Sequence, residues 1–444
     1  MKRLPEFEAY INEVCGYVQC KKAHPDIAAE LQNHMEDQKI AYTVMGMSED
    51  SATSETIRQM GNAACIGAEL NRTHRPRTNW VLLTGILTAV AVGLVLQYFV
   101  LANSGSEYQS ELFSLTISLP IGIAVMTAAF FMDCTLLLAK YPLCLYLFFI
   151  GICAAAVATP DYFRLRAYTA DFGVLLFVPL FAGILYKQKS KSMAGVFLCG
   201  LLIIPVVLLS AFGNYSKHTV CIIVLAYLAI MLTAISKSWF GKKRLRLALL
   251  SFMPLLVLAV VIWLLNCLPY GRLDNFFTFY GSQFQDWLAP PPTIRFELTR
   301  ETLAGAQWIG HAIVPDNVLE NIYQFQSTYM LTYIIGKFGW LAGLGVIAAM
   351  SAIVIRMSVL TCRQKNQLTF WVLLAVTLMI GLQSGLCILL NLTGWIAIPA
   401  NTVPLMLGSG ASLIANLCLV GIFLSVSRYQ GIMSENAMHQ IIEE

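Results

Sequence analysis

Long apolar stretches alternate with short polar connections along most of this chain. About 20 apolar residues in a helix cross the roughly 30 Å hydrocarbon core of a bilayer, and stretches of this kind recur from Trp80 onward. Ten candidate spans lie at approximately residues 80–102, 113–133, 141–158, 171–186, 193–212, 219–236, 247–268, 328–355, 369–391 and 403–427. The pattern predicts an all-α, polytopic membrane protein with ten transmembrane helices over residues 80–430.

The first 79 residues have a different pattern, because they are charged and contain no apolar run of membrane length. Apolar positions at helical spacing indicate helices at Phe7–Val18, Ile27–Val44 and Ser51–Asn71. Pro25 suits the first turn of the second helix, and Ser48 or Asp50 can cap the third. We therefore expect a small three-helix domain, a linker around residues 74–77, and a short tail over residues 431–444.

The basic residues are distributed unevenly between the two sets of loops. One set holds Lys140, Lys187, Lys189, Lys191, Lys237, Lys242, Lys243, Arg244, Arg246, Arg356, Arg363 and Lys365. The other set holds Arg164, Arg166, Lys217, Arg272, Arg295 and Arg300. Basic loops stay in the cytoplasm, so both termini are predicted to be cytoplasmic, as an even number of spans requires. The long loop at residues 269–327 is then extracytoplasmic.

Composition agrees with a membrane protein, with 57% hydrophobic and 12% charged residues and a mean hydropathy of +0.67. Soluble domains are about a quarter charged. Most cysteines lie inside apolar spans, and Cys15 with Cys20 forms a single C-x4-C pair, which argues against a zinc site. We expect no metal, no cofactor and no nucleic-acid partner. No Walker A loop is present, so the chain itself is not an ATP-driven pump.

Lys337 is the one ionisable residue clearly internal to a candidate span. Such residues are costly in a bilayer and often functional, so Lys337 is a candidate partner for a carboxylate or phosphate. A lysine that extends to the interface or lines a wet cavity explains the position equally well. Both interpretations stay open.

Motifs in the last three spans and in the long loop resemble one bacterial family. Residues 393–412 match a T-G-x-x-P-x-T-G-x-x-L-P-F-x-S-Y-G-G-S-S pattern at Thr393, Gly394, Pro404, Gly410 and Ser412, and residues 380–383 look like its I-G-x-Q, ending at Gln383. Residues 305–312 are similar to its S-G-G-x-x-G-K-G. These motifs resemble the SEDS family of cell-wall proteins, the FtsW, RodA and SpoVE group. The resemblance implies ten spans, cytoplasmic termini, a large loop after the seventh span, and residence in the bacterial cytoplasmic membrane.

Residues 1–79 separately resemble the helical prefix found ahead of some permease-like and SEDS-like proteins of Gram-positive bacteria. The similarity rests on Ala23-His24-Pro25, Ile27, Glu30-Leu31 and His34, and on Met60-Gly61-Asn62.

The chain departs from the SEDS pattern at three polar motifs. Family members polymerise lipid II, and the aspartate of their H-T-D-F motif is the proposed base that accepts a proton from the attacking sugar hydroxyl. This chain has Thr328 there, and a threonine hydroxyl does not ionise near neutral pH. Val174 replaces the lysine of Q-P-S-E-x-x-K, and residues 214–219 replace Q-P-D-L-G-T. We therefore expect no catalysis from this site, unless Asp316 or Glu320 supplies a relocated carboxylate.

Three functions follow from these observations. The first is a divergent, non-catalytic SEDS protein acting in wall growth, division, shape or sporulation by binding lipid II, another undecaprenyl-linked precursor, or a class B penicillin-binding protein or other divisome or elongasome protein. The second is an active lipid II glycosyltransferase, and the third is a transporter or flippase of a lipid-linked anionic substrate. The candidate groove residues are Lys337, Arg164, Arg166, Lys217, Gln383, Pro404, Gly410 and Ser412.

Overall fold

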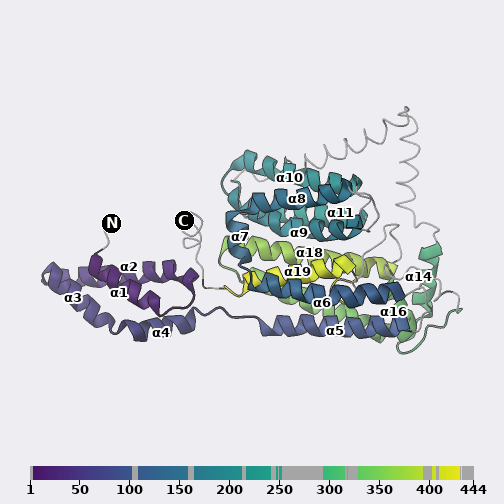
Figure 1. Ribbon diagram of the computed structural model, residues 1–444, viewed down its shortest axis with the longest axis horizontal. Coiled ribbons are helices and arrows are strands. Elements are labelled where there is room, and N and C mark those ends of the chain that lie inside the picture. The colour runs from purple at the N-terminus through teal and green to yellow at the C-terminus, as the bar shows by residue number, and fades with distance from the viewer. Residues whose placement is uncertain are drawn as a thin grey trace.

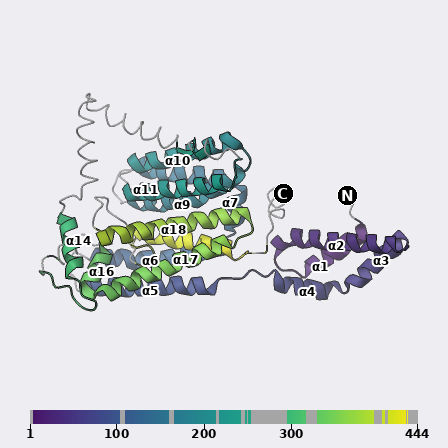
Figure 2. The ribbon, with the colours of Figure 1, turned by 180° about the vertical axis from the view of Figure 1, so that it is seen from behind.

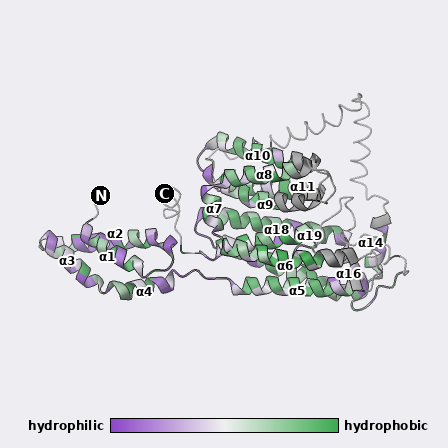
Figure 3. Cartoon of the chain, viewed as in Figure 1, coloured by the Kyte–Doolittle hydropathy of each residue, from purple (hydrophilic) through white to green (hydrophobic). Residues whose placement is uncertain are grey.

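A computed structural model of the chain describes residues 4–102, 109–158, 165–212, 217–241, 247–248, 250–252, 294–315, 318, 329–393, 403–406, 410–430 and 432. A helical bundle and a small helical domain lie end to end, joined by an extended linker (Figure 1). Green, apolar residues dominate the bundle helices, whereas the small domain mixes polar and apolar positions (Figure 3). The structure is that of a multi-pass membrane protein with a polar prefix domain, as the hydropathy pattern predicted.

The prefix domain contains four α-helices rather than the predicted three. They are α1 (Pro5–Gly16), α2 (His24–Val44), α3 (Glu49–Met60) and α4 (Ala63–Thr73), with a short 3-10 turn, η1 (Lys21–Ala23), before α2. The predicted third helix is interrupted because Gly61 has a positive φ of 84° and the side chain of Asn62 caps α4. Ser48 caps α3, as predicted.

The first six predicted spans all form helices. They are α5 (Trp80–Ala102), α6 (Gln109–Phe131), α8 (Pro142–Ala158), α9 (Leu165–Lys187), α10 (Ser192–Phe212) and α11 (Lys217–Ser236). A short helix, α7 (Cys134–Lys140), follows α6 and is bent from it by 70°. Most of the predicted seventh span lies outside the described residues.

The predicted eighth span, 328–355, is two helices rather than one. They are α16 (Met330–Phe338) and α17 (Trp340–Cys362), separated at Gly339, whose φ is 93°. The last two spans are α18 (Gln367–Thr393) and α19 (Gly410–Ser427), so the tenth begins at Gly410 rather than at residue 403. Within the described residues, α5, α17, α18 and α19 are each long and apolar enough to cross a membrane alone.

Two layers are visible in the bundle. Helices α8, α9, α10 and α11 form one layer, and α5, α6, α17 and α19 form the other, with α18 between them (Figures 1 and 2). Aromatic rings join the first layer to α18, since Trp239, just after α11, packs edge-on against Trp371 of α18 at 5.5 Å between ring centroids. Helix α14 (Ile294–Gly305), from the long loop, lies beside α16 at the end of the bundle away from the prefix domain.

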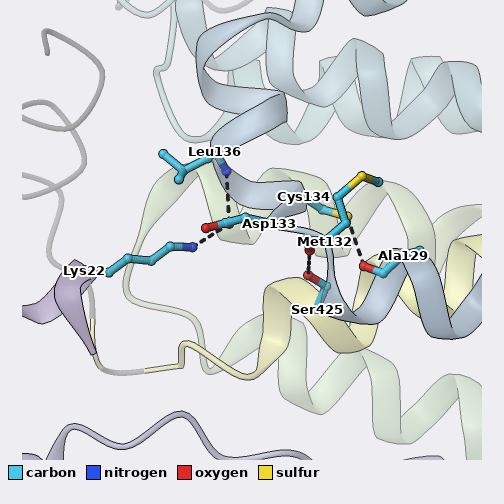
Figure 4. A network of polar contacts seen from close by, with 7 residues as sticks. All are labelled: Lys22, Ala129, Met132, Asp133, Cys134, Leu136 and Ser425. Atoms are coloured by element: carbon cyan, nitrogen blue, oxygen red, sulfur yellow. Dashed lines mark hydrogen bonds and ion pairs between the residues drawn. The ribbon is translucent and has the colours of Figure 1, made fainter. Parts of the chain in front are cut away.

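The prefix domain contacts the bundle at the bend between α6 and α7 (Figure 4). Lys22 of η1 donates to Asp133 at 2.5 Å, and Asp133 also accepts from the amide of Leu136 to cap α7. The Lys22 ammonium lies 3.8 Å from the ring centroid of Tyr429. The hydroxyl of Ser425 in α19 donates to the carbonyl of Met132 at 2.7 Å, so the bend is held by both the prefix domain and α19.

The segment after α19 also joins the two parts. Ile432 is buried in the hydrophobic core of the prefix domain, and Tyr429 packs against both cores. The amide of Arg77 in the linker donates to the carbonyl of Arg428 at 3.1 Å. Two chain segments therefore hold the prefix domain against the bundle: the linker before α5 and the segment after α19.

Candidate functional site

Polar side chains of α18 and α19 meet inside the bundle. Asn416 of α19 donates through its side-chain nitrogen to Gln383 Oε1 at 3.2 Å and to the carbonyl of Ser412 at 2.9 Å. Gln383 and Asn416 are buried, with 3% and 1% of their surface exposed. The predicted site residues Gln383 and Ser412 are thus brought together through Asn416, which belongs to none of the family motifs.

The cluster formed by Gln383, Ser412 and Asn416, here called the amide cluster, leaves hydrogen-bonding capacity unused. Gln383 Nε2 and Asn416 Oδ1 are buried and have no hydrogen-bond partner among the described residues. Buried polar atoms are nearly always paired, so an unpaired donor beside an unpaired acceptor calls for a functional explanation. Together these atoms can receive a group that both donates and accepts, such as a sugar hydroxyl or an amide.

A second polar contact fixes α16 to α18. The amide of Thr332 donates to Asn391 Oδ1 at 3.0 Å, and the Thr332 hydroxyl donates to the Asn391 carbonyl at 2.7 Å. Asn391 in turn donates to the carbonyl of Cys387 at 2.9 Å. Because Thr332 lies in the first turn of α16, Asn391 satisfies an amide that has no partner within its own helix.

The SEDS-like motif in the long loop packs on the break between α16 and α17. The amide of Ala312 donates to Gly336 O at 2.7 Å, the amide of Gly310 donates to Phe338 O at 3.2 Å, and the amide of Trp340 donates to Gln307 O at 2.9 Å. A side chain at Gly339 would meet the Trp308 carbonyl at 2.7 Å. Glycine is therefore required at the break by both its φ and its neighbour.

Lys337 is half-buried in α16, beside this break. Its ammonium donates to the hydroxyl of Tyr333, one turn earlier, at 3.2 Å. No acidic residue occurs in α16, α17, α18 or α19. The lysine is thus held among neutral groups of its own segment, an arrangement compatible with either interpretation from the sequence.

The segment containing Pro404 lies against α5. Gln97 donates to the Met406 carbonyl at 3.2 Å, and a side chain at Gly93 would meet the same carbonyl at 1.9 Å. Pro404 is buried, and Gly410, which opens α19, has a positive φ of 59°. Pro404 and Gly410 therefore shape the approach to α19, and the structure describes no hydrogen bond from either to the amide cluster.

The remaining predicted site residues are not placed in the site. Thr328, Asp316, Glu320 and Arg164 lie outside the described residues, and Arg166 and Lys217 lie in α9 and α11 without described side chains. Among the described residues no group of three His, Cys, Asp or Glu side chains is arranged to hold a metal ion.

The polar chemistry available in α16 to α19 is that of amides, hydroxyls, thiols, the ammonium of Lys337 and the guanidinium of Arg356. These groups bind and orient polar ligands, whereas a general base must accept a proton near neutral pH. Asn391, Asn416 and Thr332 were missed from the sequence. The rarity of asparagine within apolar spans was the available signal, since intramembrane polar residues usually face the bundle interior.

Comparisons with known proteins find solved structures of the same fold. No family model and no curated protein matches the sequence. A chain from a structure of a peptidoglycan synthase complex aligns with a TM-score of 0.53 and 19% identity, over 79% of this chain and 98% of that chain. The rod shape determining protein RodA of Thermus thermophilus aligns with a TM-score of 0.51 and 15% identity, over 80% of this chain and 98% of that chain. An aspartate-to-alanine variant of that RodA aligns with a TM-score of 0.53 and 14% identity, again over 80% of this chain and 98% of that chain. The fold is that of RodA, which confirms the SEDS-like architecture predicted from the motifs.

Proposed function

We propose that this chain is a non-catalytic SEDS-like protein that acts in bacterial peptidoglycan assembly by binding a lipid-linked wall precursor. The amide cluster carries the proposal. It offers an unpaired donor and an unpaired acceptor inside a RodA-like bundle, and α16 to α19 contain no carboxylate to serve as a base. Such a site suits recognition of a sugar or amide rather than proton abstraction.

Three further features support the proposal. The loop motif at residues 305–312 is held on the α16–α17 break by backbone hydrogen bonds, as a fixed wall for a site would be. Thr328 takes the place of the family's aspartate. One solved neighbour belongs to a complex that polymerises and crosslinks peptidoglycan, so a transpeptidase is the class of protein partner we propose. If the basic loops are cytoplasmic, the site lies inside the bundle in the extracytoplasmic halves of α18 and α19.

The decisive experiment measures polymerisation and binding of purified lipid II by the reconstituted protein, with and without a class B penicillin-binding protein. We expect saturable binding and no glycan chains. Each hydrogen bond contributes about 1 kcal/mol, so Gln383→Ala and Asn416→Ala should each weaken binding about fivefold. Ser358→Ala is the matched control, because that hydroxyl donates only to the Val354 carbonyl of its own helix.

Robust glycan chains would refute the non-catalytic assignment. Asp316→Ala and Glu320→Ala would then identify the base, since loss of polymerisation in one of them would show a relocated carboxylate. Absence of both binding and polymerisation would refute precursor recognition altogether.

A further inference from the structure

A long groove runs between α5 and α17, the first span and the second half of the eighth. It encloses about 820 Å³, and its walls are mainly apolar side chains of these two antiparallel helices. Small residues line both sides, including Gly85 and Thr88 on α5 and Gly345 and Ala349 on α17, and Met406 lies at one end. Small residues allow two helices to pack closely, yet here they leave an open channel.

No described side chain fills the middle of this groove. A Cβ built on Gly85 or on Gly345 meets no heavy atom within 4 Å, so both positions face open space. By contrast, a Cβ on Gly93, on the same helix as Gly85, meets backbone at 1.9 Å. α5 is therefore packed closely against the segment containing Met406, whereas an apolar slot stays open between α5 and α17 at Gly85 and Gly345. This slot is accessible from the bilayer.

Arg356 lines the groove near the C-terminal end of α17, and Val81, at the start of α5 next to the linker from the prefix domain, lines it as well. Arg356, predicted from the sequence to lie in a loop, lies within α17, six residues before the helix ends at Cys362. At 1.5 Å per residue this is about 9 Å inside the helix end. Its Nε is buried without a hydrogen-bond partner, and the described residues supply no ion pair to its guanidinium. A charge at such a depth requires a counter-ion or a path to the interface.

We propose that the groove binds an anionic glycerophospholipid, with one acyl chain along the slot and the phosphate on Arg356. A guanidinium binds phosphate oxygens through paired, charge-assisted hydrogen bonds, and the apolar walls above it match a hydrocarbon chain. The phosphate lies on the prefix-domain side of the membrane, which is the cytoplasmic leaflet in the orientation predicted from the basic loops. That position distinguishes this lipid from a wall precursor whose sugar is recognised at the amide cluster, which lies in the opposite halves of α18 and α19.

Native mass spectrometry of the full-length protein, titrated with phosphatidylglycerol or with phosphatidylcholine of the same acyl chains, tests the proposal. We expect phosphatidylglycerol to bind about tenfold more tightly, as one charge-assisted contact provides. Arg356→Gln should remove this preference. Arg363→Gln is the matched control, since Arg363 is an exposed arginine following the same helix and does not line the groove.

Filling the slot tests the acyl-chain position. Gly345→Phe and Gly85→Phe place a ring in open space from opposite walls, so both variants should fold and lose the lipid. Gly151→Phe on α8, where a Cβ also meets nothing within 4 Å, should keep it. Equal affinity for the two lipids, an unchanged preference in Arg356→Gln, or retained lipid in both groove-filling variants would each overturn the proposal. Loss of a membrane-protein partner from the groove-filling variants with unchanged lipid would show a helix-docking site instead.

Discussion

The contact between Lys22 and Asp133 predicts an asymmetric response to mutation. The side chains are 12% and 31% exposed and lie 2.5 Å apart. Burial lowers the pKa of Lys22, and the hydrogen bond and charge of Asp133 offset only part of that effect. Desolvation of the ammonium therefore exceeds the attraction within the pair. Removing only the carboxylate charge, by Asp133→Asn, leaves a mostly buried ammonium with no anionic partner.

The magnitude follows from what remains around Lys22. Breaking a fully buried pair costs about 3–5 kcal/mol, but Asp133 is partly exposed and the Tyr429 ring stays within 3.8 Å of the ammonium. We expect Asp133→Asn to weaken docking of the prefix domain by about 1–2 kcal/mol. Lys22→Met removes the charge while keeping the apolar contact, so it should cost less than about 0.5 kcal/mol. The double variant should behave like Lys22→Met alone.

Hydrogen exchange measures this docking equilibrium. The reporter amides are those of Arg77, bonded to Arg428 O, and Ile432, bonded to Tyr429 O. A loss of 1–2 kcal/mol speeds exchange by about 5- to 30-fold. In Asp133→Asn the side-chain oxygen of asparagine can still accept from the Leu136 amide at the start of α7. A faster exchange in this variant therefore does not come from loss of the helix cap. Additive effects in the double variant, or a Lys22→Met effect as large as that of Asp133→Asn, would refute the reasoning.

The same ammonium gives docking a pH dependence of defined sign. Between the lowered pKa of docked Lys22 and the ordinary value of about 10.4, the undocked state binds more protons than the docked state. Docking therefore strengthens as the pH rises through this alkaline window, after correction for intrinsic exchange rates. A pair dominated by attraction would weaken instead, and Lys22→Met should abolish the dependence.

Three further outcomes concern stability. Asn391→Ala should destabilise the protein by about 1–2 kcal/mol in reversible unfolding in mixed micelles, because it strands a buried amide of α16, whereas Ser358→Ala should stay within about 0.5 kcal/mol. Gly93→Ala should cost about 1–3 kcal/mol or prevent folding, since its Cβ would overlap a backbone carbonyl, while Gly85→Ala should be neutral in the same assay. Gly61→Ala should destabilise the prefix domain by about 1–3 kcal/mol in thermal melts, because its φ of 84° and ψ of −163° favour glycine.

Hydropathy was sufficient to find helices at the first six spans, because a run of apolar residues constrains both burial and secondary structure. It could not find the break in the predicted eighth span. Residues 330–355 are apolar on both sides of Gly339, and the break depends on backbone contacts with residues 307–312, distant in sequence. Gly61 was a comparable signal in the prefix domain, where the Gly61-Asn62 pair ends one helix and caps the next.

The site was predicted in part. Gln383 and Ser412 were selected through family motifs, and the structure joins them through Asn416. The motifs could not identify Asn416 or Asn391, because each asparagine is bonded to a residue of another helix that is distant in sequence. Asn416 of α19 bonds to Gln383 of α18, and Asn391 of α18 bonds to Thr332 of α16. Arg356 was assigned to a loop because a basic residue near a span end satisfies the topology rule whether it lies inside or outside the helix.

The break at Gly339 has a consequence for how the protein is made. Helix α17, with 23 residues, can partition into the bilayer by itself, whereas α16, with nine, extends only about 14 Å. Seven of those nine residues are buried by protein, and the first-turn amide of Thr332 is bonded to Asn391, which is synthesised 59 residues later. α16 therefore reaches its place only after α18 has been synthesised and inserted, so this part of the bundle is completed after α17 has already entered the bilayer.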